Sequence, residues 1–500
     1  MAAAQGNCPN CGAPIEFAVG SSLSKVCEYC RHTVVRSDRG LAGLGKVADL
    51  VDTPSLIAVG DEGTLSGRPL RVLGRVQLDH GFGVWDEYYV AFDYGQSWGW
   101  LAYAQGRWFA TSPIPGLGFP NYNELRLEQD VALGAAGNFR VAEIKSGKIV
   151  SAEGELPGAF PVGYVRQYID LWGINQAFGT LDYGDHTGPA LAFLGWAFPE
   201  AQLSVTALGP RSTKKVATTS LKCPNCGGDV PALAPDRSER LGCPYCGAVS
   251  DIAERKVLAQ QDQARSSPVI PIGSRGTLDG VEYLCIAMLK RGSDFDGELY
   301  EWEEFLLWNQ GIGFRWLVLD PETGWSFVSP VNLADLDLSE MPDTVRLGGR
   351  RYRQRNSNTA RVRFVLGEVY WKCEIGESTE VMDFVDGDDV LSRERAPGEV
   401  NWSQSSPRDW PTIAKAFNLP LARHAERAAA SASGYNPQVL VVLVVVVLLV
   451  GMALVLSSGG SSTTSSSSGS SGWVFSGGPS GPSGPSGSTY RGGGIFSGGK

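Results

Sequence analysis

The residues whose spacing points most clearly to chemistry are cysteines. Eight of the ten form four Cys-x-x-Cys pairs, grouped as Cys8/Cys11 with Cys27/Cys30, and Cys223/Cys226 with Cys243/Cys246. A two-residue spacer lets one tight turn present two thiolates to one ion, and two such turns supply the four soft ligands of a tetrahedral zinc site. The sequence therefore predicts two structural zinc ribbons, each with four cysteine ligands.

Disulfides and a thioredoxin-type redox pair are the alternative interpretations of these cysteines. Disulfides need an oxidising compartment, and the N-terminal residues show no basic stretch followed by an apolar one that would direct the chain there. A redox pair would normally occur once. Four thiolates leave no open coordination position, so we expect no catalysis by these metals. His32 follows the second knuckle, but four cysteines already satisfy the ion, and we expect His32 to be exposed.

Acidic clusters and one glycine-rich segment are the other groups that could do chemistry. Acids gather at 294–304 and 374–389, where they form either a solvated acidic face or a groove for a cationic ligand such as a polyamine. The segment 40–47 fits a phosphate-binding loop up to Lys46. Val47 then stands where Ser or Thr must hold Mg²⁺, so we expect no nucleotide there. No histidine lies near a nucleophile motif, so we predict no catalytic residues.

The charge balance disfavours nucleic acid as a partner. The chain carries 43 Lys and Arg against 53 Asp and Glu, a formal net charge of −10. An acidic chain repels nucleic acid unless a basic patch is segregated, and both ribbons are close to neutral. We therefore expect the ribbons to be structural or to bind protein.

The sequence that follows each ribbon is duplicated. Residues 59–67 resemble residues 272–280, and Trp100-Leu101 matches Trp316-Leu317 at a nearly fixed offset. Three carboxylates recur in both copies and are the best polar site candidates, although capping or turn roles are the alternative: Glu87/Glu303, Glu155/Glu368 and Asp170/Asp383. Glu304 could instead be the partner of Glu87. Cys285 and Cys373 stand opposite Val72 and Phe160, which predicts buried, inert thiols.

Each copy is predicted to be mainly β. Short stretches such as 70–76, 88–92 and 361–366 are rich in β-branched and aromatic residues and are bounded by Gly, Pro and Asp. Helical periodicity is scarce before residue 411. The fold class predicted is therefore two zinc ribbons and two duplicated mostly-β domains, with one transmembrane α-helix and a disordered tail.

The repeat resembles a known bacterial family. The pattern Ile-Gly-x-x-Gly-Thr-Leu-x-Gly, the segments 302–307 and 313–317, and the later Gly-Glu are similar to the domain of unknown function 4178. The resemblance covers residues 57–200 and 270–411, and the second copy is the closer one. Members couple zinc ribbons and a membrane helix to this domain. The resemblance implies no established activity, and only an association with membrane stress and polyamine metabolism.

The C-terminal part predicts a membrane anchor. Val439–Leu456 is eighteen consecutive apolar residues, and a helix of this length spans about 27 Å, close to the hydrocarbon thickness of a bilayer. Residues 406–438 carry four bases against two acids. The positive-inside rule then keeps the N-terminal region cytoplasmic and places the tail outside. The Ser/Gly-rich tail cannot bury a core and is expected to be disordered.

The expected organisation follows from these features: ribbon 1 at 1–38, linker 39–56, β domain 57–210, ribbon 2 at 219–256, β domain 270–411, juxtamembrane helical segment 412–437, transmembrane helix 438–456 and tail 457–500. The expected function is a non-catalytic scaffold or sensor in the inner membrane, whose β domains bind protein partners or a small ligand. The alternative is an enzyme or enzyme accessory that handles a cationic small molecule such as a polyamine. It predicts that Glu303, Glu368 and Asp383 converge on one pocket.

Overall fold

The computed structural model describes residues 5–19, 21–37, 40–46, 56–79, 84–104, 107–115, 118–184, 190–206, 220–233, 238–252, 255–261, 268–295, 298–371 and 373–422. The described residues up to Asn418 belong to one compact unit. This part of the chain is mainly β, as predicted.

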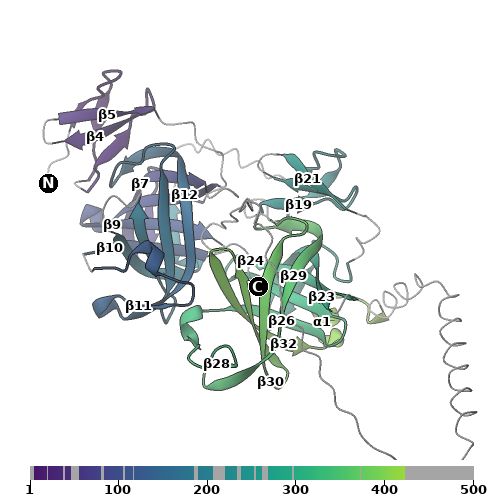
Figure 1. The fold of residues 1–500 in the computed structure, drawn as a ribbon. Coiled ribbons are helices and arrows are strands. Elements are labelled where there is room, and N and C mark those ends of the chain that lie inside the picture. The colour runs from purple at the N-terminus through teal and green to yellow at the C-terminus, as the bar shows by residue number, and fades with distance from the viewer. Residues whose placement is uncertain are drawn as a thin grey trace, which may run out of the picture. The chain divides into compact units, whose positions relative to one another are not determined.

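Two antiparallel meanders close into what we call the first ring (Figure 1). Strand β10 pairs with β15, and β12 pairs with β7, so that eight strands form a continuous circle. Its strands are β7 (Arg68–Asp79), β8 (Val84–Phe92), β9 (Ser97–Ala104), β10 (Arg107–Ile114), β12 (Asn138–Leu156), β13 (Val165–Trp172), β14 (Ala177–Gly184) and β15 (Leu191–Phe198). The short strands β6 (Glu62–Leu65), β11 (Asp130–Ala132) and β16 (Leu203–Thr206) pair at its edges.

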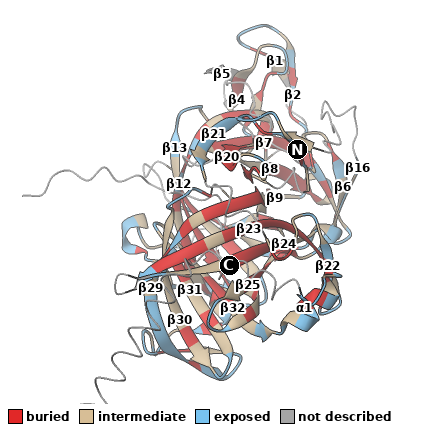
Figure 2. Cartoon of the chain, turned by 90° about the vertical axis from the view of Figure 1, so that its right-hand side faces the viewer, coloured by how far each residue is buried: buried red, intermediate tan, exposed pale blue. Residues whose placement is uncertain are grey.

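The second ring repeats this pairing. Strand β26 pairs with β32, and β29 pairs with β23. Its strands are β23 (Val281–Phe295), β24 (Glu298–Asn309), β25 (Gly313–Asp320), β26 (Gly324–Val331), β29 (Arg350–Val369), β30 (Ser378–Asp386), β31 (Asp389–Ala396) and β32 (Glu399–Arg408). Edge strands are β22 (Arg275–Leu278), β27 (Leu336–Asp337) and β28 (Thr344–Leu347). Figure 2 shows long buried stretches along β23 and β24.

Apolar residues on both faces of the strands explain why the sequence alternates so weakly. In β8, Tyr89 and Ala91 pack in one core cluster, while Tyr88, Val90 and Phe92 pack in another. A strand buried on both sides reads as a continuous apolar run. The run 88–92 is therefore apolar throughout because its two faces pack in two different core clusters.

Each ribbon extends its own ring. Strands β3 (Ser24–Val26) and β19 (Arg240–Gly242) pair with β12 and β29 at equivalent positions. The other ribbon strands are β1 (Gln5–Asn7), β2 (Pro14–Glu16), β4 (His32–Ser37), β17 (Ser220–Lys222), β18 (Asp229–Pro231) and β20 (Ala248–Asp251). The expected linker 39–56 contributes β5 (Gly40–Lys46), which pairs with β4, so this segment is a strand and not a phosphate-binding loop. Strand β21 (Lys256–Gln260) pairs with β20 and takes the second ribbon beyond its expected end.

The two rings share a buried cluster. It contains Phe109 and Trp172 of the first ring and Tyr352 and Trp402 of the second. Around it, Arg140 Nη1 donates to the carbonyl oxygens of Leu333 and Leu336, at 3.1 and 2.6 Å. Apolar burial and directed hydrogen bonds therefore hold the rings against one another.

A short helix, α1 (Trp410–Ala416), follows β32. The Asp409 side chain accepts from Thr412 N at its N-terminus, and Trp410 stacks on Trp325. None of the described helices is long and apolar enough to cross a membrane. The predicted transmembrane helix 438–456 and the tail 457–500 lie outside the described residues.

Candidate metal centres and ligand cavity

The first four-cysteine group comes together at the tip of the first ribbon. The Sγ atoms of Cys8 and Cys30 lie 3.6 Å apart, and those of Cys11 and Cys27 lie 3.7 Å apart. Turns that position the thiolates are closed by Gly12 N donating to Cys8 O and Arg31 N donating to Cys27 O, each at 2.9 Å. All four thiols lie within 4.8 Å of one another, which suits one tetrahedral metal ion.

The first ribbon departs from the usual knuckle at Arg31. This residue adopts a φ of 58°, in the left-handed region that Gly occupies in the other knuckles, such as Gly12 at 77°. His32 follows it but is not part of the four-cysteine group, and its Nδ1 lies 3.3 Å from the carbonyl oxygen of Cys30. The side chain is partly buried, where we expected it to be exposed.

The second group has the same geometry. Cys223 and Cys246 lie 3.7 Å apart at Sγ, and Cys226 and Cys243 lie 3.9 Å apart. In addition, Asn225 Nδ2 lies 3.4 Å from Cys246 Sγ, where it supports a thiolate. Both groups could hold a metal ion, and four thiolate donors suit zinc or another soft ion.

Glu155 and Glu368 anchor the ribbons to the rings. Glu155 is buried and accepts from Ala18 N and Ser22 Oγ, both at 2.7 Å. Glu368, at the equivalent position, accepts from Leu233 N and Ser238 Oγ. Each carboxylate accepts charge-assisted hydrogen bonds from donors in a ribbon loop. The recurrence of this Gly-Glu pair in the sequence therefore reflects docking.

A cavity of about 250 Å³ lies inside the first ring. A closed sheet of eight strands is just wide enough to hold one small ligand. Charged groups of Glu87, Arg166 and Asp182 line the cavity, and half of the other lining residues are aromatic: Trp98, Trp100, Phe109, Phe160, Tyr168, Phe178 and Phe193. Trp100 and Phe160 meet edge to face, with ring centroids 5.8 Å apart. These rings offer faces to an apolar or cationic group.

Carboxylates exceed bases around this cavity. Asp170 is buried and accepts from Thr180 Oγ1 at 2.7 Å, and it forms an ion pair with Lys145. Lys145 also lies 3.3 Å from Glu143, and Arg166 pairs with Asp182. Among the charged residues that line the cavity itself, Glu87 and Asp182 are acids and Arg166 is a base, which leaves one negative charge when all are ionised. The site therefore favours a cation electrostatically.

Glu87 is the titratable group of this cavity whose charge is least compensated. Its Oε1 accepts from Trp85 Nε1 at 3.2 Å. Burial raises the pKa of Glu87 to about 7, against the lowering influence of Trp85 and Lys145. Burial also acts on Lys145, but Asp170 and Glu143 outweigh it and raise the pKa of this ammonium group. Glu87 is therefore the group that changes charge near neutral pH.

The structural counterpart of Glu87 in the second ring is Glu304, so the predicted match of Glu87 with Glu303 is wrong. Glu87 stands opposite Val76 in the first ring, and Glu304 stands opposite Leu289, the equivalent position in the second. Trp302 Nε1 donates to Glu304 at 2.6 Å, as Trp85 does to Glu87. The second ring neutralises this carboxylate with a buried arginine, because Arg291 Nη1 lies 3.5 Å from Glu304 and 2.9 Å from Glu394.

The structure does not bring together the three carboxylates expected to form an acidic pocket in the second copy. Glu303 pairs with Lys290 at 3.3 Å, and Glu368 is bound by the ribbon loop. Asp383 accepts from Ser392 Oγ at 2.6 Å, as Asp170 does from Thr180 in the first ring. That prediction is wrong because the three carboxylates lie on different strands, β24, β29 and β30, and each is bound by a different local partner.

The two remaining cysteines lie in the core, as predicted. Cys285 and Cys373 are both fully buried, and burial raises the pKa of each thiol. A buried thiol in an apolar setting is a poor nucleophile.

Comparison with known proteins found a match for one part of the chain. No curated protein and no solved structure matches it. Residues 271–409, which comprise the second ring with its edge strands, match the model of a protein family described as a domain of unknown function, DUF4178.

Proposed function

We propose that this protein is a non-catalytic, membrane-anchored scaffold or sensor that binds a small ligand inside its first ring. The observation that carries the proposal is the aromatic cavity with an excess of carboxylates around it. Concave, mostly apolar cavities with a few convergent polar groups are typical of ligand sites. Because residues 57–210 share the strand order and register of the second ring, we propose that they are a second copy of the same domain.

In this proposal the ribbons are structural zinc sites. Eight cysteines would hold two zinc ions: Cys8, Cys11, Cys27, Cys30, Cys223, Cys226, Cys243 and Cys246. Metal binding supplies folding free energy to modules that are too small to build a core. The hydrogen bonds of Glu155 and Glu368 would then hold each folded ribbon against its ring.

The anchor is part of the proposal. The apolar run Val439–Leu456 supports insertion in the inner membrane, with the ribbons and rings on the cytoplasmic side and the tail outside. Lipid is then one partner, and protein partners would complete a scaffold. The resemblance to domain of unknown function 4178 favours a role in envelope or membrane stress. We expect no nucleic acid partner.

The cavity favours a ligand with an apolar body and a positive charge. Trp100 and its aromatic neighbours would contact the apolar body or the cationic group. A desolvated contact between a cation and an aromatic ring is worth about 2 kcal/mol. Glu87 and Asp182 would face the charge. A neutral molecule of the same shape would leave the negative charge of the cavity uncompensated.

Calorimetry on the full chain in detergent tests this proposal. The probes are spermidine, choline and 3,3-dimethylbutan-1-ol, which is choline without its charge. At a pH near 8, where Glu87 is ionised, we expect a cation to bind and the alcohol to bind at least about tenfold more weakly. Glu87→Gln should weaken binding, whereas Glu304→Gln, the matched change in the second ring, should not. Equal binding of choline and the alcohol, or no binding of either cation, would contradict the proposal.

An enzyme or enzyme accessory acting on a cationic small molecule is the second candidate. The observation that favours it is the position of Glu87 in the cavity with a pKa of about 7, which suits a general base. Conversion of a bound amine by the wild type, lost in Glu87→Gln, would support this candidate over the non-catalytic one.

A further inference from the structure

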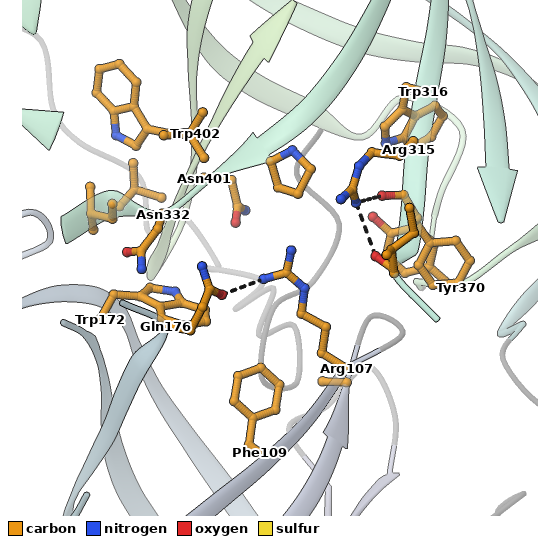
Figure 3. A pocket seen from close by; sticks show the side chains of 17 residues that line it. Arg107, Phe109, Trp172, Gln176, Arg315, Trp316, Asn332, Tyr370, Asn401 and Trp402 are labelled. Carbon is orange, nitrogen blue, oxygen red and sulfur yellow. Dashed lines mark hydrogen bonds between the residues drawn. The ribbon is translucent and has the colours of Figure 1, made fainter. Parts of the chain in front are cut away.

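Two arginines, one from each ring, point into a pocket separate from the cavity of the first ring. Arg107 begins β10 and Arg315 lies in β25, and their guanidinium groups face a common space of about 100 Å³ (Figure 3). Asn332 and Asn401 add amide groups to the wall. The described residues that line this pocket include no carboxylate.

No described residue neutralises either guanidinium. Arg107 Nη1 donates to Gln176 Oε1 at 3.2 Å. Arg315 Nη1 donates to the carbonyl oxygens of Ile312 and Phe314, at 3.2 and 2.6 Å. Within the described part of the chain, neither arginine forms an ion pair, although most of the other partly buried bases of the rings do.

The surroundings make these two positive charges costly. The aromatic side chains of Trp172, Tyr370 and Trp402 line the pocket and limit its hydration. Burial lowers the pKa of Arg107, and the charge of Arg315 lowers it further. Like charges held together in a partly buried space destabilise the unliganded state. An anion between them would relieve both the repulsion and the desolvation.

We propose that this pocket binds a small dianion, carrying either a phosphate group or two carboxylates, between Arg107 and Arg315. Two guanidinium groups match two negative charges, and the planar fork of each recognises carboxylate and phosphate oxygens alike. At about 10–15 Å³ for each water-sized position, 100 Å³ holds a molecule of several heavy atoms, such as phosphate or a short dicarboxylate.

This dianion would link the two rings. Arg107 and Gln176 belong to the first ring and its connections, and Arg315 and Asn401 belong to the second. Binding would add to the ring–ring contact that Glu128 makes with Arg393 Nε, at 2.8 and 3.0 Å. Occupancy would therefore stabilise the packing of one ring on the other.

The experiment is a titration of the full-length protein in detergent with inorganic phosphate and with succinate, in a buffer of about 0.15 M chloride. We expect one dianion to bind with a stoichiometry of one and to raise the melting temperature. The preferred dianion identifies the ligand as a phosphate compound or a dicarboxylate. Arg107→Gln and Arg315→Gln should each weaken binding at least about tenfold, because each removes charge-assisted hydrogen bonds.

A second measurement separates a binding arginine from a structural one. Without ligand, Arg107→Gln should unfold at the same temperature as the wild type or higher, since it removes a repulsion. Arg346, an exposed residue paired with Glu340 at 2.7 Å, provides the control variant Arg346→Gln, which should bind like the wild type. The proposal is overturned if neither dianion binds the wild type with a Kd below about 10 mM, which corresponds to a binding free energy near 3 kcal/mol. Unchanged binding in both pocket variants, or equal weakening by Arg346→Gln, also overturns it.

Discussion

The half-buried carboxylate of Glu87 makes the stability of the first ring depend on pH in a direction opposite to that of most acidic residues. Burial raises the pKa of Glu87 from its ordinary value of 4.5 to about 7. In the folded state this group therefore holds its proton to a higher pH than in the unfolded state. Stability attributable to Glu87 is present below pH 4.5 and falls as the pH rises towards 7.

The magnitude follows from the two pKa values. A difference of about 2.5 in pKa corresponds to about 3 kcal/mol, of which about 2–3 kcal/mol is lost between pH 5 and pH 8. Glu87→Gln removes the titration while its amide oxygen can still accept from Trp85 Nε1. The variant should therefore gain stability relative to the wild type as the pH rises. At about 2–4 °C per kcal/mol for a domain of 150–250 residues, the melting temperatures should separate by about 4–12 °C.

The assay is thermal unfolding of both proteins from pH 5 to pH 8, without ligand. Both carry the same ribbons, so any pH dependence of metal binding cancels in the difference. Glu62→Gln is the control, because Glu62 is exposed on the edge strand β6. A difference between Glu87→Gln and the wild type that stays constant over this range, or that changes in the opposite direction, would refute the reasoning.

Four further predictions concern the metals, the docking of the ribbons, the core thiols and the anchor. Metal analysis should find two zinc ions per chain, and Cys226→Ser should reduce this to one because three thiolates hold zinc poorly. Glu368→Gln should destabilise the docking of the second ribbon by about 2–3 kcal/mol, since hydrogen bonds to a buried charge are weakened, and chemical denaturation measures this loss. Cys285 and Cys373 should resist a thiol reagent until the protein unfolds, because both are buried. Deletion of 439–456 should move the protein from the membrane fraction to the supernatant, and its retention in membranes would contradict the anchor.

The ribbons could be predicted because their signal is local. Cys8 and Cys11 fix one half of a site through a single turn, and the pair at Cys27 and Cys30 lies one hairpin away. Short spacing decides this geometry with little help from the rest of the chain. Even the unusual Arg31 left the knuckle intact, because a positive φ is tolerated there by a non-glycine residue at a modest cost.

Ring closure could not be predicted, because it depends on distant pairings. Strand β12 must find β7, and β10 must find β15 across a long stretch of chain. Composition and alternation identify strands but do not state which edges meet. The β5 strand was missed for a related reason, since four of its residues, 40–46, are Gly or Ala, which are depleted in strands.

The cavity was missed because its charged residues are buried. Sequence patterns place Lys145 and Arg166 on the surface, yet both lie against carboxylates of the first ring. The correct partner of Glu87 in the second copy, Glu304 and not Glu303, could have been identified from the sequence. Trp85 and Glu87, like Trp302 and Glu304, are two residues apart and so share one face of a strand. Matching that Trp-x-Glu spacing selects Glu304.

The central claim is that the first ring binds a cation among its aromatic residues, and fluorine NMR of the full chain tests it most directly. The protein would carry 5-fluorotryptophan, with the Trp98 and Trp100 resonances assigned through Trp98→Phe and Trp100→Phe. Titration with choline should shift these two resonances in a saturable way, because both side chains line the cavity. The neutral alcohol should shift them far less at the same concentration. Shifts confined to other tryptophans, or equal shifts with the alcohol, would contradict the account.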